Sequence, residues 1–250
     1  MIEDDGKLCS TIAQTAGQVL VVLQKSGLFR DKVLGQTGDE IANLLISKAL
    51  GLARPNDAIL SEESTDDLGR LHAKRVWIVD PLDGTREYAE GRPDWAVHVA
   101  VVVDGKPVAG AVAIPARELT FATCNNVQLA PWSDTSKLRM LVSRSRPCEA
   151  AGYVADALKA EIVPMGSAGA KAMAVLRGDA EIYLHCGGQY EWDSCAPAAV
   201  AAAAGLHVSR IDGTELRYNQ RETYLPDLLI CRPEIAHRVL VALSNSGCKS

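Results

Sequence analysis

The stretch from Val76 to Thr85 reads Val-Trp-Ile-Val-Asp-Pro-Leu-Asp-Gly-Thr, and it decides the fold prediction. Its four apolar residues are typical of a short buried strand, and Asp80-Pro81 predicts the end of that strand. Asp83 follows three residues after Asp80, so a tight turn would bring two carboxylates together at the edge of a sheet. A divalent cation relieves the repulsion between such carboxylates. The stretch therefore predicts a metal site, and the alternative is a plain turn with a helix cap.

The next two residues, Gly84 and Thr85, are predicted to open a short helix. Free N–H groups at a helix start, after a glycine that lets a ligand approach the backbone, suit a phosphate. A second Asp-Gly-Thr sequence occurs at residues 212–214, but Ser209 stands three residues before its aspartate. Without a carboxylate partner, this second copy is predicted to be a surface turn.

Two more acidic positions follow predicted elements. Residues 58–60 read as a strand that delivers Glu62, eighteen residues before Asp80. Asp193 precedes an alanine-rich helix predicted over residues 195–204, so we expect it at or near the N-cap. Taken alone, each position is also explained by a solvated strand end or an ordinary helix cap.

A turn at residues 164–169, Pro-Met-Gly-Ser-Ala-Gly, leads from a predicted strand into a predicted helix. Gly166 and Ser167 there could offer backbone N–H groups to a hydroxyl or a phosphate. A lone Gly-Ser turn is a weak signal of function.

The remaining patterns predict two lobes, residues 1–136 and 137–250. The first lobe is α+β, with helices over residues 7–28 and 39–52, where Asp39 lies near the first turn of the second helix. A hairpin joins residues 95–103 to 108–114 through Asp104-Gly105, and residues 119–122 continue its sheet. The second lobe is α/β. Its predicted strands are 138–142, 162–163, 182–184, 208 and 228–230, and its predicted helices are 148–158, 169–176, 195–204 and 233–243.

Composition excludes several classes of protein. The 250 residues are 48% apolar and 23% charged, which is ordinary for a globular chain, and the net charge is −5 (26 basic minus 31 acidic). Binders of extended nucleic acid normally carry net positive charge. No apolar run approaches the ~20 residues of a membrane span, and the acidic start is unlike a secretory signal. We therefore expect a cytoplasmic protein without membrane or nucleic-acid partners.

The cysteines and histidines show no metal-binding or disulfide pattern. The seven cysteines include no C-x-x-C pair and are odd in number, so we interpret them as reduced and mostly buried. The five histidines lack metal-ligand spacing and are interpreted as core or surface residues. Motifs of serine hydrolases, P-loop kinases, dinucleotide oxidoreductases and zincins are absent.

Four segments that occur in one order along the chain strengthen the functional interpretation of these separate signals. They are Ser61-Glu62-Glu63, Asp80 to Thr85, Gly166-Ser167-Ala168 and Glu191-Trp192-Asp193. In this order they resemble the inositol monophosphatase family of metal-dependent, lithium-sensitive phosphatases, and the resemblance covers essentially the whole chain. It implies an α/β fold, a layered αβαβα sandwich, and suggests a homodimer.

The resemblance also implies roles for individual residues. Carboxylates of Glu62, Asp80, Asp83 and Asp193, with the Leu82 carbonyl oxygen, would hold two or three Mg²⁺ ions. Asp39 and Thr85 would orient the attacking water, with Glu62 and Asp83 beside it. The Gly84 and Thr85 amides would take the phosphate, and Gly166, Ser167 and Asp193 would contact the substrate. An all-oxygen ligand set is independently what Mg²⁺ prefers.

The substrate follows from finer similarity. Residues 60–64 and 190–193 look like the branch of the family that acts on 3'-phosphoadenosine 5'-phosphate. The inositol branch tends to have a glutamate seven residues before the last aspartate, where this chain has Cys186. Lys171 could pair with the second phosphate, although it could equally be a solvent-facing lysine. Residues 194–197, Ser-Cys-Ala-Pro, depart from that branch.

We therefore expect a phosphomonoesterase that removes the 3'-phosphate of 3'-phosphoadenosine 5'-phosphate by metal-activated water, clearing a by-product of sulfate activation. One alternative is an inositol monophosphatase or a broad sugar phosphatase acting on fructose 1,6-bisphosphate. Another is a non-catalytic, metal-dependent nucleotide sensor.

Overall fold

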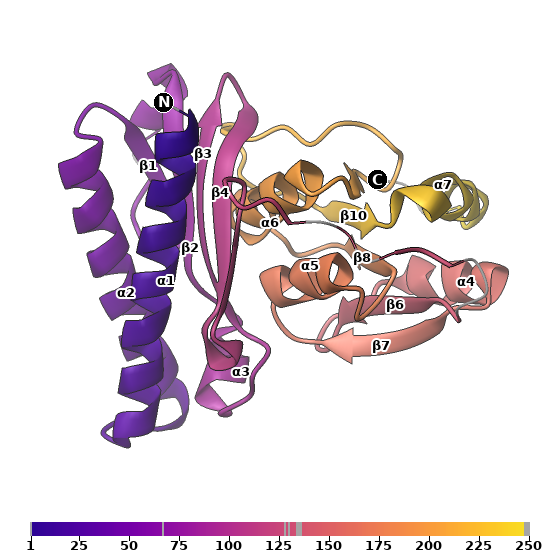
Figure 1. The fold of residues 1–250 in the computed structure, drawn as a ribbon, viewed down its shortest axis with the longest axis horizontal. Helices are drawn as coiled ribbons and strands as arrows, with labels where there is room; N and C mark the ends of the chain where they lie inside the picture. Colours follow the sequence, from indigo (N-terminus) through magenta and orange to yellow (C-terminus); the bar gives the residue numbers. More distant parts are fainter. Residues whose placement is uncertain (1, 67, 128, 130, 134–136, 248–250) are drawn as a thin grey trace.

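The computed structural model describes residues 2–66, 68–127, 129, 131–133 and 137–247, and it arranges them in five layers (Figure 1). Helices α1 (Ile2–Ser26) and α2 (Asp31–Ala53) cover one face of a first sheet. Helices α5 (Ala168–Arg177) and α6 (Glu191–Ala203) lie between this sheet and a second one. Helices α4 (Glu149–Leu158) and α7 (Ala236–Asn245) cover the far side of the second sheet. The αβαβα sandwich implied by the resemblance is confirmed.

The first sheet has the strand order β1-β2-β3-β4-β5. Strands β1 (Ala58–Ser61) and β2 (Arg75–Asp83) pair in parallel, whereas β3 (Ala96–Val103), β4 (Lys106–Ile114) and β5 (Leu119–Ala122) continue the sheet in antiparallel fashion. The predicted hairpin is confirmed. Asp104 and Gly105 adopt φ values of 50° and 77° at its tip, because a two-residue turn that matches the strand twist needs positive φ at both positions.

The second sheet has the order β7-β6-β8-β10-β9. Its strands are β6 (Arg139–Ser143), β7 (Glu161–Met165), β8 (Ile182–Cys186), β9 (His207–Ser209) and β10 (Asp227–Cys231). β7 and β8 run parallel to β6, and β10 runs antiparallel to β8. The two sheets use separate parts of the chain, but α5 and α6 pack between both, so the lobe boundary at residue 136 stays a prediction.

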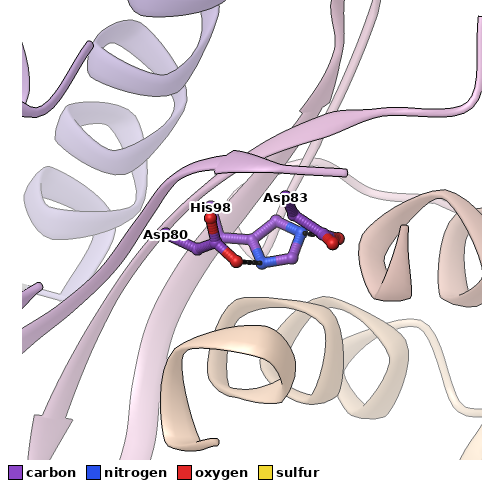
Figure 2. Close-up of side chains that lie close together, drawn as sticks. All are labelled: Asp80, Asp83 and His98. Atoms are coloured by element: carbon purple, nitrogen blue, oxygen red, sulfur yellow. Dashed lines mark ion pairs between the residues drawn. The ribbon is translucent and has the colours of Figure 1, made fainter. Parts of the chain in front are cut away.

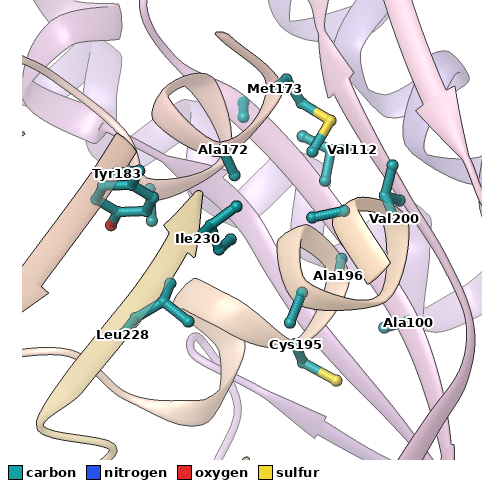
Figure 3. Packing of buried hydrophobic residues seen from close by; sticks show 14 of the residues in the cluster. Ala100, Val112, Ala172, Met173, Tyr183, Cys195, Ala196, Val200, Leu228 and Ile230 are labelled. Carbon is teal, nitrogen blue, oxygen red and sulfur yellow. The ribbon is translucent and has the colours of Figure 1, made fainter. Parts of the chain in front are cut away.

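Both faces of the first sheet are buried. Trp77 packs with the α1 and α2 side, and the next residue, Ile78, packs with the α5 and α6 side, because successive strand side chains point to opposite faces. Small residues let α6 approach closely: a Cβ on Gly110 would lie 3.1 Å from the Ala199 Cβ. Figure 3 shows the resulting packing of Ala100, Ala196 and Val200. The alanine-rich sequence of α6 is therefore a packing feature.

Two predicted boundaries are wrong. Helix α2 begins at Asp31, so Asp39 lies mid-helix rather than in the first turn. The first two turns escaped the apolar pattern because they bury glycines: a Cβ on Gly35 would lie 2.7 Å from Thr85 Cγ2, and one on Gly38 2.9 Å from Tyr88 Cε1. The second error is the start of α6, which begins at Glu191 rather than near residue 195. Asp193 lies near the N-cap, as expected, at the third position of the helix.

Strand β2 also differs from the prediction, because it does not end at Asp80. It continues to Asp83, with a shift of register against β3 between these two residues. Proline is tolerated at such an irregularity because no ladder hydrogen bond is needed from its nitrogen. The tight turn between the two aspartates is therefore a bulged strand end.

The interpretation of all cysteines as reduced is wrong for one pair. Cys148 and Cys186 form a disulfide, with their Cα atoms 5.1 Å apart. The pair is separated by 38 residues and joins the start of α4 to the end of β8, so no local motif could reveal it. Cys9, Cys195 and Cys231 are buried free thiols, Cys124 is an exposed one, and Cys248 lies outside the described residues.

Two smaller observations complete the fold. The second Asp-Gly-Thr sequence, residues 212–214, lies in an exposed turn between β9 and β10, as predicted. None of the described helices combines the length and the apolar character needed to cross a membrane.

Candidate active site

Parallel pairing of β1 with β2 brings two carboxylates to one sheet edge. Ser61 lies opposite Val79 in the register, and the Glu62 N–H donates to the Val79 carbonyl at 3.3 Å. Glu62 and Asp80 follow directly, so their side chains leave the sheet at the same end. Asp80 is fully buried, and its Oδ1 accepts a hydrogen bond from the Leu82 N–H at 3.2 Å.

Asp193 reaches the same place from α6. Its Oδ2 accepts a hydrogen bond from the Tyr190 N–H at 2.7 Å, which fixes the carboxylate at the helix start. A polar cavity of about 160 Å³ separates this helix from the sheet edge. The cavity is lined by all but one of the predicted site residues: Glu62, Asp80, Leu82, Asp83, Gly84, Thr85, Gly166, Ser167, Lys171 and Asp193.

Asp39, the remaining predicted residue, lies behind this wall. The Thr85 hydroxyl lies 3.0 Å from Asp39 Oδ2 and 3.1 Å from the Leu82 carbonyl oxygen. Asp39 is 7% exposed, and its other carboxyl oxygen has no hydrogen-bond partner among the described residues. Burial raises the pKa of Asp39 to about 8, and the negative charge of Glu63 adds to this effect. Asp39 and Thr85 thus form a pair that can exchange a proton.

The sequence analysis missed His98, which lies between Asp80 and Asp83 (Figure 2). Its Nε2 lies 3.1 Å from Asp83 Oδ2 and its Nδ1 lies 4.0 Å from Asp80 Oδ2. Nδ1 also lies 3.2 Å from the Trp192 carbonyl oxygen. His98 is the cross-strand partner of Asp80 in the β2–β3 register, so an explicit hairpin alignment was the one signal that could have located it.

Asp83 is held more firmly than its neighbours. Its Oδ2 accepts a 2.5 Å hydrogen bond from the Ser167 hydroxyl and a 2.7 Å bond from the Gly169 N–H. Burial alone would raise the pKa of Asp83, but the neighbouring His98 ring, the Lys171 ammonium and the Ser167 hydroxyl lower it to about 2. The carboxylate is therefore kept charged, with Oδ1 free of these contacts.

The other carboxylates show the opposite shift. Burial raises the pKa of Asp193 to about 6 and that of Glu62 to about 7, with like charge from neighbouring carboxylates as the next cause. Glu62 is partly screened, because it stands exposed at the cavity mouth. Burial and the Glu62 charge raise the pKa of Asp80 well above its usual value. A divalent cation would let all of them ionise, and oxygen-only donors fit Mg²⁺.

A narrower cluster also fits a cation: one ligand atom each from Asp80, Asp83 and His98 lies within 4.8 Å of the others. His98 Nε2 already lies 3.1 Å from Asp83 Oδ2, and Mg²⁺ prefers oxygen ligands. The carboxylates and the Leu82 carbonyl oxygen therefore suit Mg²⁺ better than this cluster does, and their role as its ligands stays a prediction.

The phosphate-facing elements agree only in part with the predictions. Gly84 adopts φ +90° before the short helix α3 (Thr85–Ala89), so a glycine is required there. At the second turn, by contrast, the Gly166 N–H donates to Asp94 Oδ2 at 2.8 Å, and the Gly169 N–H is used by Asp83. The Gly166 amide is therefore already used within the protein, and substrate contact by Gly166 and Ser167 stays a prediction.

Lys171 is also different from expectation. It is 3% exposed, so the solvent-facing alternative is wrong. Its ammonium donates to the carbonyl oxygens of Met165, Gly166 and Ser167. The proposed contact of Lys171 with a second phosphate stays a prediction that this geometry does not favour.

Comparison with known proteins shows the family to which this chain belongs. A profile of the inositol monophosphatase family matches residues 31–246. The chain therefore belongs to the inositol monophosphatase family. The CysQ protein of Bacteroides thetaiotaomicron, a bacterial member of that family, superposes with a TM-score of 0.78 at 24% identity, covering 92% of this chain and 97% of the other.

Curated relatives narrow the class further. A 3'-phosphoadenosine 5'-phosphate phosphatase of Mycobacterium bovis is 48% identical over 240 residues, covering 92% of this chain and 90% of its own. A protein of the same name from Mycobacterium leprae is 46% identical over 245 residues, covering 93% and 90%.

Proposed function

We propose that this protein is a Mg²⁺-dependent phosphomonoesterase that converts 3'-phosphoadenosine 5'-phosphate to AMP and phosphate. The observation that carries the proposal is the identity of 46–48% to phosphatases of that name, over nine-tenths of both chains. The cavity supports it, because four carboxylates and a carbonyl oxygen converge there as a Mg²⁺ site requires.

In this proposal Glu62, Asp80, Asp83, Asp193 and the Leu82 carbonyl oxygen hold two or three Mg²⁺ ions. When bound, Mg²⁺ lowers the pKa of a coordinated water and neutralises charge on the phosphate ester. These carboxylates come from three places, the end of β1, strand β2 and helix α6, so folding itself sets the spacing of the ligands. His98 and the start of α5 keep Asp83 charged and immobile.

Thr85 and Asp39 would orient the attacking water. The Thr85 oxygen can accept a proton from that water while its own hydroxyl proton passes to Asp39 Oδ2, 3.0 Å away. With a pKa of about 8, Asp39 is ionised and able to accept that proton mainly at about pH 8 and above. The backbone amides at Gly84 and Thr85 would bind the phosphate as its charge develops.

The first experiment compares Mg²⁺-dependent phosphate release from 3'-phosphoadenosine 5'-phosphate, inositol 1-phosphate and fructose 1,6-bisphosphate. A kcat/KM advantage of about a hundredfold for the nucleotide would support the proposal. Similar values for all three would instead identify a general sugar phosphatase. The cysteine at position 186 favours the nucleotide, because the inositol branch tends to have a glutamate there.

Asp83→Asn tests the site itself. We expect kcat to fall by a factor of about 100 or more, because a fixed anionic ligand is lost while its shape remains. Asp212→Asn is the matched control, since Asp212 belongs to the second, exposed Asp-Gly-Thr turn. Equal activity of the two variants would reject the proposed site.

A metal-dependent nucleotide sensor is the second candidate. It would bind 3'-phosphoadenosine 5'-phosphate in the presence of Mg²⁺ without releasing phosphate. The intact Asp39–Thr85 pair favours catalysis, because a sensor has no need to orient water. Lithium inhibition at saturating substrate is a further expectation for the enzyme.

Removal of a by-product of sulfate activation in the cytoplasm is the cellular role we propose. Assembly as a homodimer is proposed from the family resemblance alone, and sedimentation of the purified protein tests it.

A further inference from the structure

Three cationic side chains among the described residues line the cavity: Arg144, Arg146 and Lys171. They differ in whether their charge is already used. The ammonium of Lys171 is buried and surrounded by three carbonyl oxygens. The guanidinium of Arg144 pairs with Glu87 at 2.8 Å and with Glu90 at 3.0 Å. Neither cation is free to bind an additional anion.

Arg146 is the exception. It is exposed, and no carboxylate of the described residues lies within ion-pair distance of it. His185, which lines the cavity nearby, adds no charge at neutral pH, because burial lowers its pKa to about 4. Within the described part of the cavity wall, Arg146 is therefore the cation without an acidic partner.

The Arg146 side chain is held in position by the neighbouring turn. Its guanidinium lies on the turn Gly187-Gly188, where a Cβ on Gly188 would come within 2.3 Å of Nη1. Both glycines adopt positive φ, 79° and 73°, which favours glycine on backbone grounds as well. The disulfide ties Cys148, two residues after Arg146, to Cys186, two residues before Gly188. The cation and the turn beneath it are therefore covalently linked.

We propose that Arg146 binds the second phosphate of the substrate, the one that is not removed, and so determines the preference for bisphosphates over monophosphates. This inference rests on the proposed phosphatase function. The reacting phosphate would lie among the metal ligands, and a second phosphate at the rim would otherwise meet a wall dominated by carboxylates. A planar guanidinium can offer two parallel hydrogen bonds to one phosphate, and its charge offsets that repulsion.

The test compares substrates that differ only in the second phosphate. Arg146→Ala should lower kcat/KM for 3'-phosphoadenosine 5'-phosphate by roughly 30- to 100-fold, the loss typical of a charged hydrogen-bonded contact. Its kcat/KM for adenosine 3'-phosphate should change less than about twofold. Gly188→Ala should reproduce the selective loss by displacing the guanidinium. Arg117→Ala, which removes an exposed arginine outside the cavity lining, should affect neither substrate.

Binding supplies a readout that does not depend on turnover. AMP retains the second phosphate and lacks the reacting one, so calorimetry with Mg²⁺ should show its Kd rising at least about tenfold in Arg146→Ala. Adenosine, which carries neither phosphate, serves as the reference ligand. An unchanged Kd for AMP, or an equal loss of kcat/KM on both substrates, would overturn the assignment of Arg146. Failure of the wild type to hydrolyse either substrate would instead count against the proposed function, and AMP binding would then decide the role of Arg146.

Discussion

Gly169 supports the charged Asp83 indirectly, because it leaves room for the His98 ring beside that carboxylate. A Cβ on Gly169 would lie 2.1 Å from His98 Nε2, so only glycine allows the ring and the start of α5 to meet at Asp83. Gly169→Ala should therefore lower the free energy of unfolding by about 1 to 3 kcal/mol and reduce kcat as well. Urea denaturation and phosphate release measure the two effects.

Gly152→Ala is the matched control, because Gly152 lies in a helix with nothing within 4 Å of its added Cβ. It should raise the free energy of unfolding by about 0.4 to 1 kcal/mol. If Gly169→Ala behaves like this control, the contact between Gly169 and His98 has no structural importance.

At the scale of single residues, the sequence identified the carboxylates of the site better than the residues that contact them. Asp80 and Asp83 were found because both lie in one short segment with an unusual carboxylate spacing. His98 was not, because its role depends on strand register. Lys171 was left open between a phosphate contact and a solvent-facing position, because a lone lysine gives no sign of three carbonyl partners. The sequence predictions fail most often at residues whose role depends on contacts with distant parts of the chain.

Among the elements, the connection between α4 and β8 depends on the Cys148–Cys186 disulfide. Reduction, or Cys148→Ser, should lower the free energy of unfolding by about 4 kcal/mol for a loop of 38 residues in the chain-entropy model. Urea denaturation with and without dithiothreitol measures the loss. Cys124→Ser, which removes an exposed free thiol, should leave stability and the response to dithiothreitol unchanged. A wild type indifferent to reductant would show that the disulfide does not form in solution.

Most helices and strands could be predicted from periodicity, and their errors share one cause. The hairpin of β3 and β4 was found because alternation and an Asp-Gly turn are local signals. The first turns of α2 and α6 were missed because their packing uses glycine or polar residues that carry no apolar period. The bulged continuation of β2 was missed because a proline normally ends a strand.

On the scale of the whole molecule, the cavity joins the two sheets. Asp80 and Asp83 lie in β2 and Glu62 directly follows β1, whereas Asp193 lies in α6. Figure 1 shows α6 between the two sheets. Periodicity predicted the elements of each lobe but not their stacking, and the five-layer order came from the family resemblance. The long-range arrangement places the carboxylates so close that the folded state without metal carries electrostatic strain.

That strain predicts how stability depends on pH and on metal. The folded pKa values of Asp39, about 8, and Glu62, about 7, lie above those of an unfolded chain. Their contribution to stability is complete below the unfolded values and is lost as pH rises through the folded ones. In EDTA, the free energy of unfolding should therefore fall by a few kcal/mol between about pH 4 and 8, mainly through the buried Asp39, because solvent screens the exposed Glu62. His185 acts in the opposite direction, because its folded pKa of about 4 lies below that of an unfolded histidine, and its contribution to stability rises with pH up to about 6.5.

Excess Mg²⁺ should remove most of this loss, because a cation that binds only the folded state stabilises it by about 2.7 kcal/mol at a hundredfold excess over Kd. The measurement is Tm at several pH values in EDTA and in Mg²⁺. Asp80→Asn should be more stable than the wild type in EDTA at high pH, since it removes a buried charge, and should gain little from Mg²⁺. If Mg²⁺ leaves the Tm of the wild type unchanged, or raises the Tm of Asp80→Asn as much as that of the wild type, these carboxylates hold no metal. A Mg²⁺-dependent rise in Tm that occurs in the wild type and not in Asp80→Asn would support metal binding by these carboxylates.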